Sequence, residues 1–93
     1  MDTVERVAEI LLQAGETHHM VYQNVDGDDP DWASWYADWL INLSELPQVL
    51  GAAPIRSELV YLLVGCGKEF ADGGGSGRWE EAYAKTLVEK LSR

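Results

Sequence analysis

The sequence feature that most constrains the fold is a run of large aromatic residues at helical spacing. Between positions 32 and 43 such side chains recur every three or four residues, at Trp32, Trp35, Tyr36, Trp39, Leu40 and Leu43. Residues at this spacing share one face of an α-helix. Asp29-Pro30 precedes the run, and Asp is a favoured N-cap while Pro suits the first helical position. The pattern predicts a helix over 30–44 whose tryptophan face forms the centre of the core.

The same periodicity predicts the remaining helices, over about 3–25, 45–50 (a short one), 54–71 and 78–91. Thr3 is the predicted N-cap of the first helix, Gly51 the stop after the short one, and Pro54 the start of the next. No segment has the sustained alternation of a β-strand. The sequence therefore predicts an all-α fold, a compact array of four to five helices joined by short loops.

Chain length predicts a single domain over 1–93, because 93 residues with a hydrophobic fraction of 46% supply one core. The segment 72–77 is rich in glycine and reads as a flexible loop before the last helix. Gly15 interrupts the first helix at a cost of about 1 kcal/mol, which predicts either close packing against another helix or a break. The helix over 54–71 is apolar enough to predict burial around most of its circumference.

The charge balance argues against two classes of binding partner, and other sequence features indicate the cellular compartment. With 16 acidic and 7 basic residues the net charge is -9, which disfavours direct binding to nucleic acid or to an anionic membrane surface. No apolar run reaches the roughly 20 residues of a membrane span, and the first residues lack the pattern of a signal peptide. The single cysteine, Cys66, excludes an internal disulfide and reads as a small buried residue. We therefore expect a cytoplasmic protein.

A histidine pair beside an acidic turn is the candidate metal site. His18 and His19 are adjacent, so on a helix their side chains diverge by about 100° and cannot chelate one ion together. One interpretation places His18 in the core, hydrogen-bonded to a neighbour. The other combines a histidine with Glu16, Asp26, Asp28 and the rest of the turn 26–31 as ligands of a divalent metal such as Zn, Mn or Fe. No cofactor is otherwise indicated.

Arg56 and Glu58 lie at the start of the apolar helix over 54–71, and we expect their charges to be neutralised by partners if that helix is buried. Arg56 can pair with Asp38 or with Asp31, and an ion pair of this kind is more often architectural than catalytic. The sequence contains no complete catalytic motif, which favours a protein that is not an enzyme.

Three stretches of the chain are distinctive: Glu16-Thr17-His18-His19, the run Asp-Pro-Asp-Trp-Ala-Ser-Trp-Tyr-Ala-Asp-Trp-Leu at 29–40, and Arg-Ser-Glu-Leu at 56–59. In these stretches the chain from about residue 16 to 70 resembles a family of small uncharacterised bacterial proteins. The resemblance implies a helical fold. It implies no reaction, cofactor or partner, because none is assigned to that family.

Two functions follow from these patterns. Tryptophan and tyrosine are favoured at binding hot spots. The first hypothesis is therefore a non-enzymatic helical interaction module that binds a protein partner or a second copy through Trp32, Trp35, Tyr36 and Trp39. The alternative is a metal- or small-ligand-binding protein, with enzymatic activity left open, that uses His18 or His19 with Glu16 and the acidic turn.

Overall fold

A computed structural model describes residues 2–22, 32–73 and 77–91 of the chain, apart from the side chains of residues 21 and 22. Within those ranges the chain forms helices only, which confirms the predicted all-α class. They are α1 (Thr3–Tyr22), α2 (Trp32–Asn42), the short α3 (Leu46–Leu50), α4 (Arg56–Asp72) and α5 (Trp79–Leu91).

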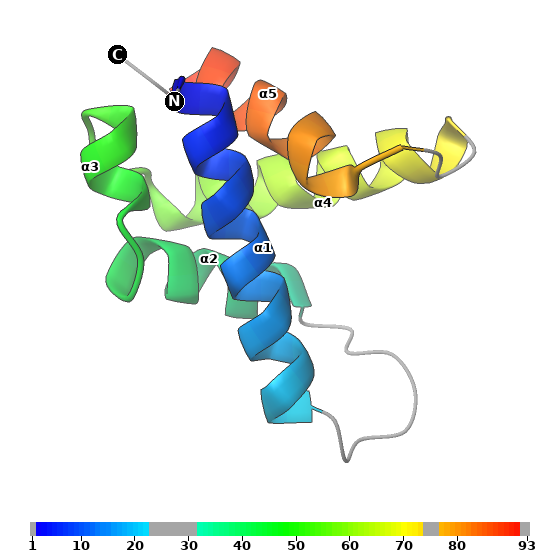
Figure 1. Cartoon of the computed structure of the whole chain (residues 1–93), viewed down its shortest axis with the longest axis horizontal. Helices are drawn as coiled ribbons and strands as arrows, with labels where there is room; N and C mark the ends of the chain where they lie inside the picture. The colour runs from blue at the N-terminus through cyan, green and yellow to red at the C-terminus, as the bar shows by residue number, and fades with distance from the viewer. Residues whose placement is uncertain (1, 23–31, 74–76, 92–93) are drawn as a thin grey trace.

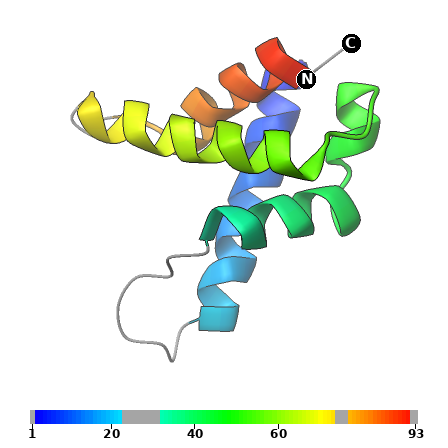
Figure 2. The same ribbon diagram turned by 180° about the vertical axis from the view of Figure 1, so that it is seen from behind.

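The four long helices pack in a closed circuit. α1 lies against α5 and α2, and α4 lies against the same two helices. Figure 1 shows α1 crossing the molecule with α4 behind it, and Figure 2 shows from the other side that α4 runs between α5 and α2. α3 packs against α1 and α2 at the far end of α2. α1 and α4 therefore hold α2 and α5 at a fixed separation, with the first turns of both on the same side of α1.

Local signals explain the helix ends, with two corrections to the predicted caps. Asp2, and not Thr3, caps α1, because its Oδ1 accepts a hydrogen bond of 2.8 Å from the backbone N–H of Glu5. α4 begins at Arg56 after an extended Ile55, two residues later than Pro54 predicts. The predicted stop at Gly51 is confirmed, since its φ of 79° is left-handed and its N–H bonds to the carbonyl of Pro47.

The predicted ends of two helices also differ from the structure. α2 ends at Asn42, and Ser44 follows it with its hydroxyl donating to the carbonyl of Leu40 and accepting from the N–H of Leu46. These bonds turn the chain into α3. Asp72, predicted to open the glycine loop, is the last residue of α4. Residues 23–25 and 30–31, predicted as helix, and loop residues 74–76 lie outside the described ranges.

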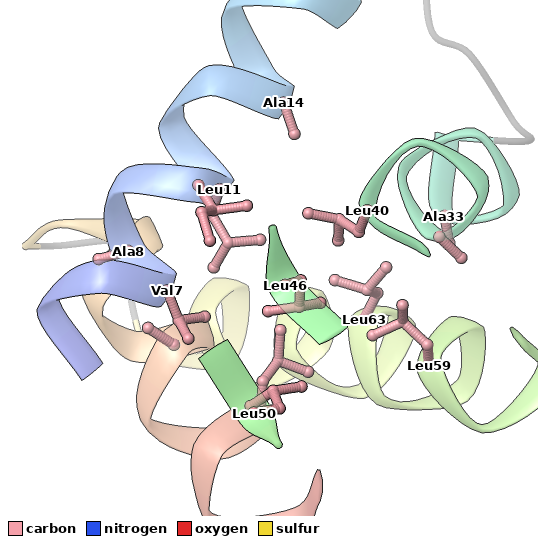
Figure 3. Close-up of a cluster of buried hydrophobic side chains, with 14 residues drawn as sticks. Val7, Ala8, Leu11, Ala14, Ala33, Leu40, Leu46, Leu50, Leu59 and Leu63 are labelled. Atoms are coloured by element: carbon pink, nitrogen blue, oxygen red, sulfur yellow. The ribbon is translucent and has the colours of Figure 1, made fainter. Parts of the chain in front are cut away.

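The core is built from small and aliphatic side chains (Figure 3). Its buried members are Val7, Ala8, Ile10, Leu11, Ala14, Ala33, Ala37, Leu40, Leu46, Leu50, Leu59, Leu63, Ala84 and Leu87. The prediction that the tryptophan face of α2 forms the centre of this core is confirmed for Leu40 only, since most of the aromatic residues of that face pack against the core and are partly buried. α2 turns Ala33, Ala37 and Leu40 inward, because small side chains let α1 and α4 approach closely. The indoles flank this contact and are only partly buried.

Helix α4 is also less buried than its composition predicts. Leu59, Leu63 and Cys66 face the core, whereas Tyr61 is 75% exposed and Val64 38% exposed. Because α4 is covered by α2 on one side and α5 on another, its third side is left to solvent. Large apolar side chains therefore remain on the surface.

Candidate functional site

The aromatic residues of α2 divide between two separate depressions of the surface. Trp35 and Trp39 line a groove of about 440 Å³, which we call the outer groove; its other described lining residues are Thr17, Asp38, Asn42 and Leu43. Trp32 and Tyr36 turn toward α5. With Trp79 and Tyr83 they line a smaller depression of about 200 Å³, which we call the aromatic box.

The aromatic box consists of two matching pairs, each a Trp followed by a Tyr four residues later on the same helix. The ring centroids of Trp32 and Tyr36 lie 5.7 Å apart with the planes at 86°, and those of Trp79 and Tyr83 lie 5.2 Å apart at 82°. Edge-to-face contacts of this kind are favourable because the positive edge of one ring meets the negative face of the other. Perpendicular rings also form the walls of a concave site, as a flat stack would not.

Two glycines make room for these rings. A Cβ placed on Gly15 of α1 would lie 3.3 Å from Cζ2 of Trp79 and 3.5 Å from the hydroxyl of Tyr36. A Cβ on Gly67 of α4 would lie 3.3 Å from the hydroxyl of Tyr83 and 3.4 Å from Cζ2 of Trp32. Each glycine thus receives the tryptophan of one pair and the tyrosine of the other. The close packing that Gly15 predicts is confirmed.

The aromatic box shares lining residues with two neighbouring grooves. Toward α1 a groove of about 670 Å³ is lined by Tyr36 and Trp79 together with Leu12, Gly15, Glu16, His19 and Met20. Toward α4 a groove of about 210 Å³ is lined by Tyr83 together with Cys66, Glu69, Phe70, Gly73, Ala82 and Thr86. Glu16 supplies a carboxylate to the groove toward α1, and Glu69 supplies one to the groove toward α4. The described residues lining all three depressions include no Lys or Arg.

Burial raises the pKa of the two tyrosines of the box and of the thiol beside it. It raises the pKa of Tyr36, an effect that the neighbouring Tyr83 adds to. Burial likewise raises the pKa of Tyr83, with a smaller contribution from Cys66. The pKa of the Cys66 thiol is also raised by burial, against the opposing effect of its hydrogen bond with Thr86. At physiological pH the box therefore offers π faces and neutral hydroxyls, and the thiol beside it is a weak nucleophile, as the predicted burial of Cys66 implies.

The outer groove carries an ion pair at its edge. Nε of Arg56 lies 2.6 Å from Oδ1 of Asp38, and this hydrogen bond lowers the pKa of the Asp38 carboxyl. Asp38 is one of the two partners predicted for Arg56, and the other, Asp31, lies outside the described residues. Leu43, at the end of the groove, is 73% exposed, an unusual state for a large aliphatic side chain.

The predicted metal ligands do not gather at one point in the described structure. Glu16 and His19 line the same groove, while His18 is half-buried against Trp35 and Tyr36, with ring centroids 5.0 and 5.2 Å away. Asp26 and Asp28 lie outside the described residues. Among those described, no three His, Cys, Asp or Glu side chains form a cluster able to hold a metal ion. Metal binding by this set stays a prediction.

The sequence did not predict Trp79 and Tyr83 of the aromatic box as site residues. Trp79 and Tyr83 fall on one face of the last predicted helix, but nothing in periodicity says which other helix that face meets. The available signal was the repeated spacing, since Trp32/Tyr36 and Trp79/Tyr83 are both Trp-x-x-x-Tyr. Gly67 carries the same kind of information as Gly15, a helical glycine beneath an aromatic ring.

Comparison of the chain with protein-family models, curated proteins and solved structures gives no match. The resemblance to small bacterial proteins therefore stays an expectation, and function has to be inferred from the side chains. Among the described helices, none combines the length and the apolar character needed to cross a bilayer.

Proposed function

We propose that this protein is a helical interaction module that binds an amphipathic helix of a partner protein in the outer groove. The observation that carries the proposal is the apolar surface at the end of α2, where Leu43 is 73% exposed beside Trp35 and Trp39. Exposed aromatic and aliphatic side chains grouped around a groove mark protein interfaces. The groove is lined by Thr17 of α1 and by residues between 35 and 43, at the C-terminal end of α2 and just beyond it, and an apolar groove is the kind of surface into which an amphipathic helix lays its apolar face.

Charge favours a basic partner over a second copy of the chain. Each copy carries a net charge of -9, so two copies approaching one another repel. A partner helix with Lys or Arg residues flanking its apolar anchors is attracted instead, and complementary charge also speeds encounter. The proposed occupant is therefore a basic amphipathic helix. Self-association through the same groove is the competing outcome.

The test uses synthetic helical peptides with Leu and Trp anchors at positions i, i+4 and i+7, in a lysine-flanked and a glutamate-flanked series. Binding is followed by fluorescence anisotropy of the labelled peptide. We expect saturable binding of the lysine series, weakened about tenfold by Leu43→Ser, because a hot-spot side chain contributes on the order of 1–2 kcal/mol. Tyr61→Ser is the matched control, since Tyr61 is 75% exposed and does not line the groove.

Three results contradict the proposal. Equal effects of Leu43→Ser and Tyr61→Ser would show that the outer groove is not the contact surface. Equal binding of the two peptide series would remove the charge argument. A dimer in sedimentation equilibrium that Leu43→Ser dissociates would replace the partner helix with a second copy.

A further inference from the structure

We infer that the aromatic box, Trp32, Tyr36, Trp79 and Tyr83, is a binding site for a quaternary ammonium group. The site is distinct from the outer groove, which is lined by Trp35 and Trp39 instead. Its ligand is an organic cation whose positive charge is spread over methyl groups, as in choline. The inference does not depend on the proposed partner helix.

The geometry of the rings supports this chemistry. The face of an indole or phenol ring carries negative potential and attracts a cation within about 6 Å of the ring centroid. Four rings from α2 and α5 line one depression, and the rings of each pair stand nearly perpendicular. A cation in the box therefore meets rings on several sides. Gly15 and Gly67 make this possible, because a side chain at either position would press on the rings.

The electrostatic setting also favours a cation. The described residues lining the box and both neighbouring grooves include no Lys or Arg, whereas Glu16 and Glu69 line those two grooves. The positive ends of the α2 and α5 dipoles lie near the box and act against a cation. In the first turn of α5, Glu80 and Glu81 oppose that effect with a net charge of one, because Arg78 pairs with both at 2.6 and 3.6 Å.

The absence of a carboxylate among the described residues lining the box selects the type of cation. A primary ammonium or a metal ion holds its water strongly and needs several oxygen ligands in exchange. The box offers only the hydroxyls of Tyr36 and Tyr83 as oxygen ligands, alongside π surface. A quaternary ammonium donates no hydrogen bond and is well matched to ring faces. A depression of about 200 Å³ has room for such a head group.

The first experiment compares choline with its uncharged isostere, in which a tert-butyl group replaces the trimethylammonium group. Binding to the purified protein is measured by NMR titration of the indole N–H signals. We expect choline to shift the signals of Trp32 and Trp79 saturably, and to bind at least about tenfold more tightly than the isostere, because several cation–π contacts are lost together. A peptide containing trimethyllysine forms a second arm, and its binding relative to choline shows whether the group comes from a protein or a small molecule.

Variants locate the site. Trp79→Leu is expected to weaken choline binding about fivefold, the effect of one indole, whereas Trp39→Leu in the outer groove leaves it unchanged. Should Trp79→Leu fail to give the wild-type circular dichroism spectrum, Trp32→Leu removes the opposite wall. Three results overturn the inference. The first is equal affinity for choline and its isostere, and the second is failure of the folded wild type to bind either ammonium probe. The third is an equal effect of Trp79→Leu and Trp39→Leu on choline binding. Peptide binding in the outer groove is read separately, so either proposal can fail alone.

Discussion

Two glycines of α4, Gly65 and Gly67, give a matched test of how the aromatic box is built. Both lie inside the helix and neither has a positive φ, so replacement by Ala brings each the same gain in helix propensity, about 1 kcal/mol. Their surroundings differ. A Cβ on Gly65 meets nothing within 4 Å, whereas one on Gly67 lies 3.3 Å from the Tyr83 hydroxyl and 3.4 Å from the Trp32 ring.

Gly65→Ala is therefore expected to stabilise the protein by about 1 kcal/mol, raising the thermal midpoint by roughly 4–8 °C for a domain of this size. In Gly67→Ala the rings must move by a few tenths of an ångström, and overpacking costs about 1–3 kcal/mol. The Gly67 variant should then lie about 1–3 kcal/mol below the Gly65 variant in urea denaturation followed by circular dichroism.

The same pair reports on ligand binding. Displacing Trp32 and Tyr83 changes the walls of the box, so Gly67→Ala should also weaken choline binding while Gly65→Ala leaves it at the wild-type value. If Gly67→Ala stabilised the protein as much as Gly65→Ala does, the rings would not rest on Gly67. The description of the box would then be wrong.

Two further predictions test the core and the edge of the outer groove. Leu40→Ala empties a site with 0% exposure and should cost about 2–5 kcal/mol of unfolding free energy in urea titrations, while a loss below about 1 kcal/mol would contradict its central place. Arg56 lowers the pKa of Asp38, so the carboxylate stabilises the fold above the ordinary aspartate pKa, and this contribution is lost as pH falls through the lowered value. Thermal melts should therefore show the difference between wild type and Asp38→Asn shrinking on acidification, and a difference that persists at the acidic end would refute the assignment.

Helix positions were predictable from sequence because they depend on local chemistry. Gly51 ends α3 because glycine, which has no side chain, adopts the left-handed conformation without a steric clash. A glycine at the end of a helical pattern is visible in the sequence. The helix start predicted at Pro54 is wrong because Pro also suits the extended stretch before a helix. The N-cap position is Ile55. For α1, Asp2 and Thr3 are both good caps, and only the observed bond to Glu5 separates them.

Burial was less predictable, since it depends on how closely helices approach. Periodicity marks Trp32, Trp35 and Trp39 as one face of α2, and hydrophobicity alone places that face in the core. The neighbouring face of Ala33 and Ala37 packs better, because a helix contact lined by small residues brings backbones closer than one lined by indoles. The tryptophans therefore lie at the margins of the contact, where they line the aromatic box and the outer groove.

The candidate site depends on a tertiary coincidence that no single helix specifies. Tyr36 and Trp79 both lie close to Gly15, and Trp32 and Tyr83 both lie close to Gly67, so each glycine brings together side chains from two other helices. Glycine at either helical position costs about 1 kcal/mol of helix propensity relative to Ala, and this cost is offset because a side chain there would press on the rings. The concave arrangement of the two pairs therefore depends on glycine at both positions, and the periodicity of one helix cannot show which rings from other helices those glycines receive.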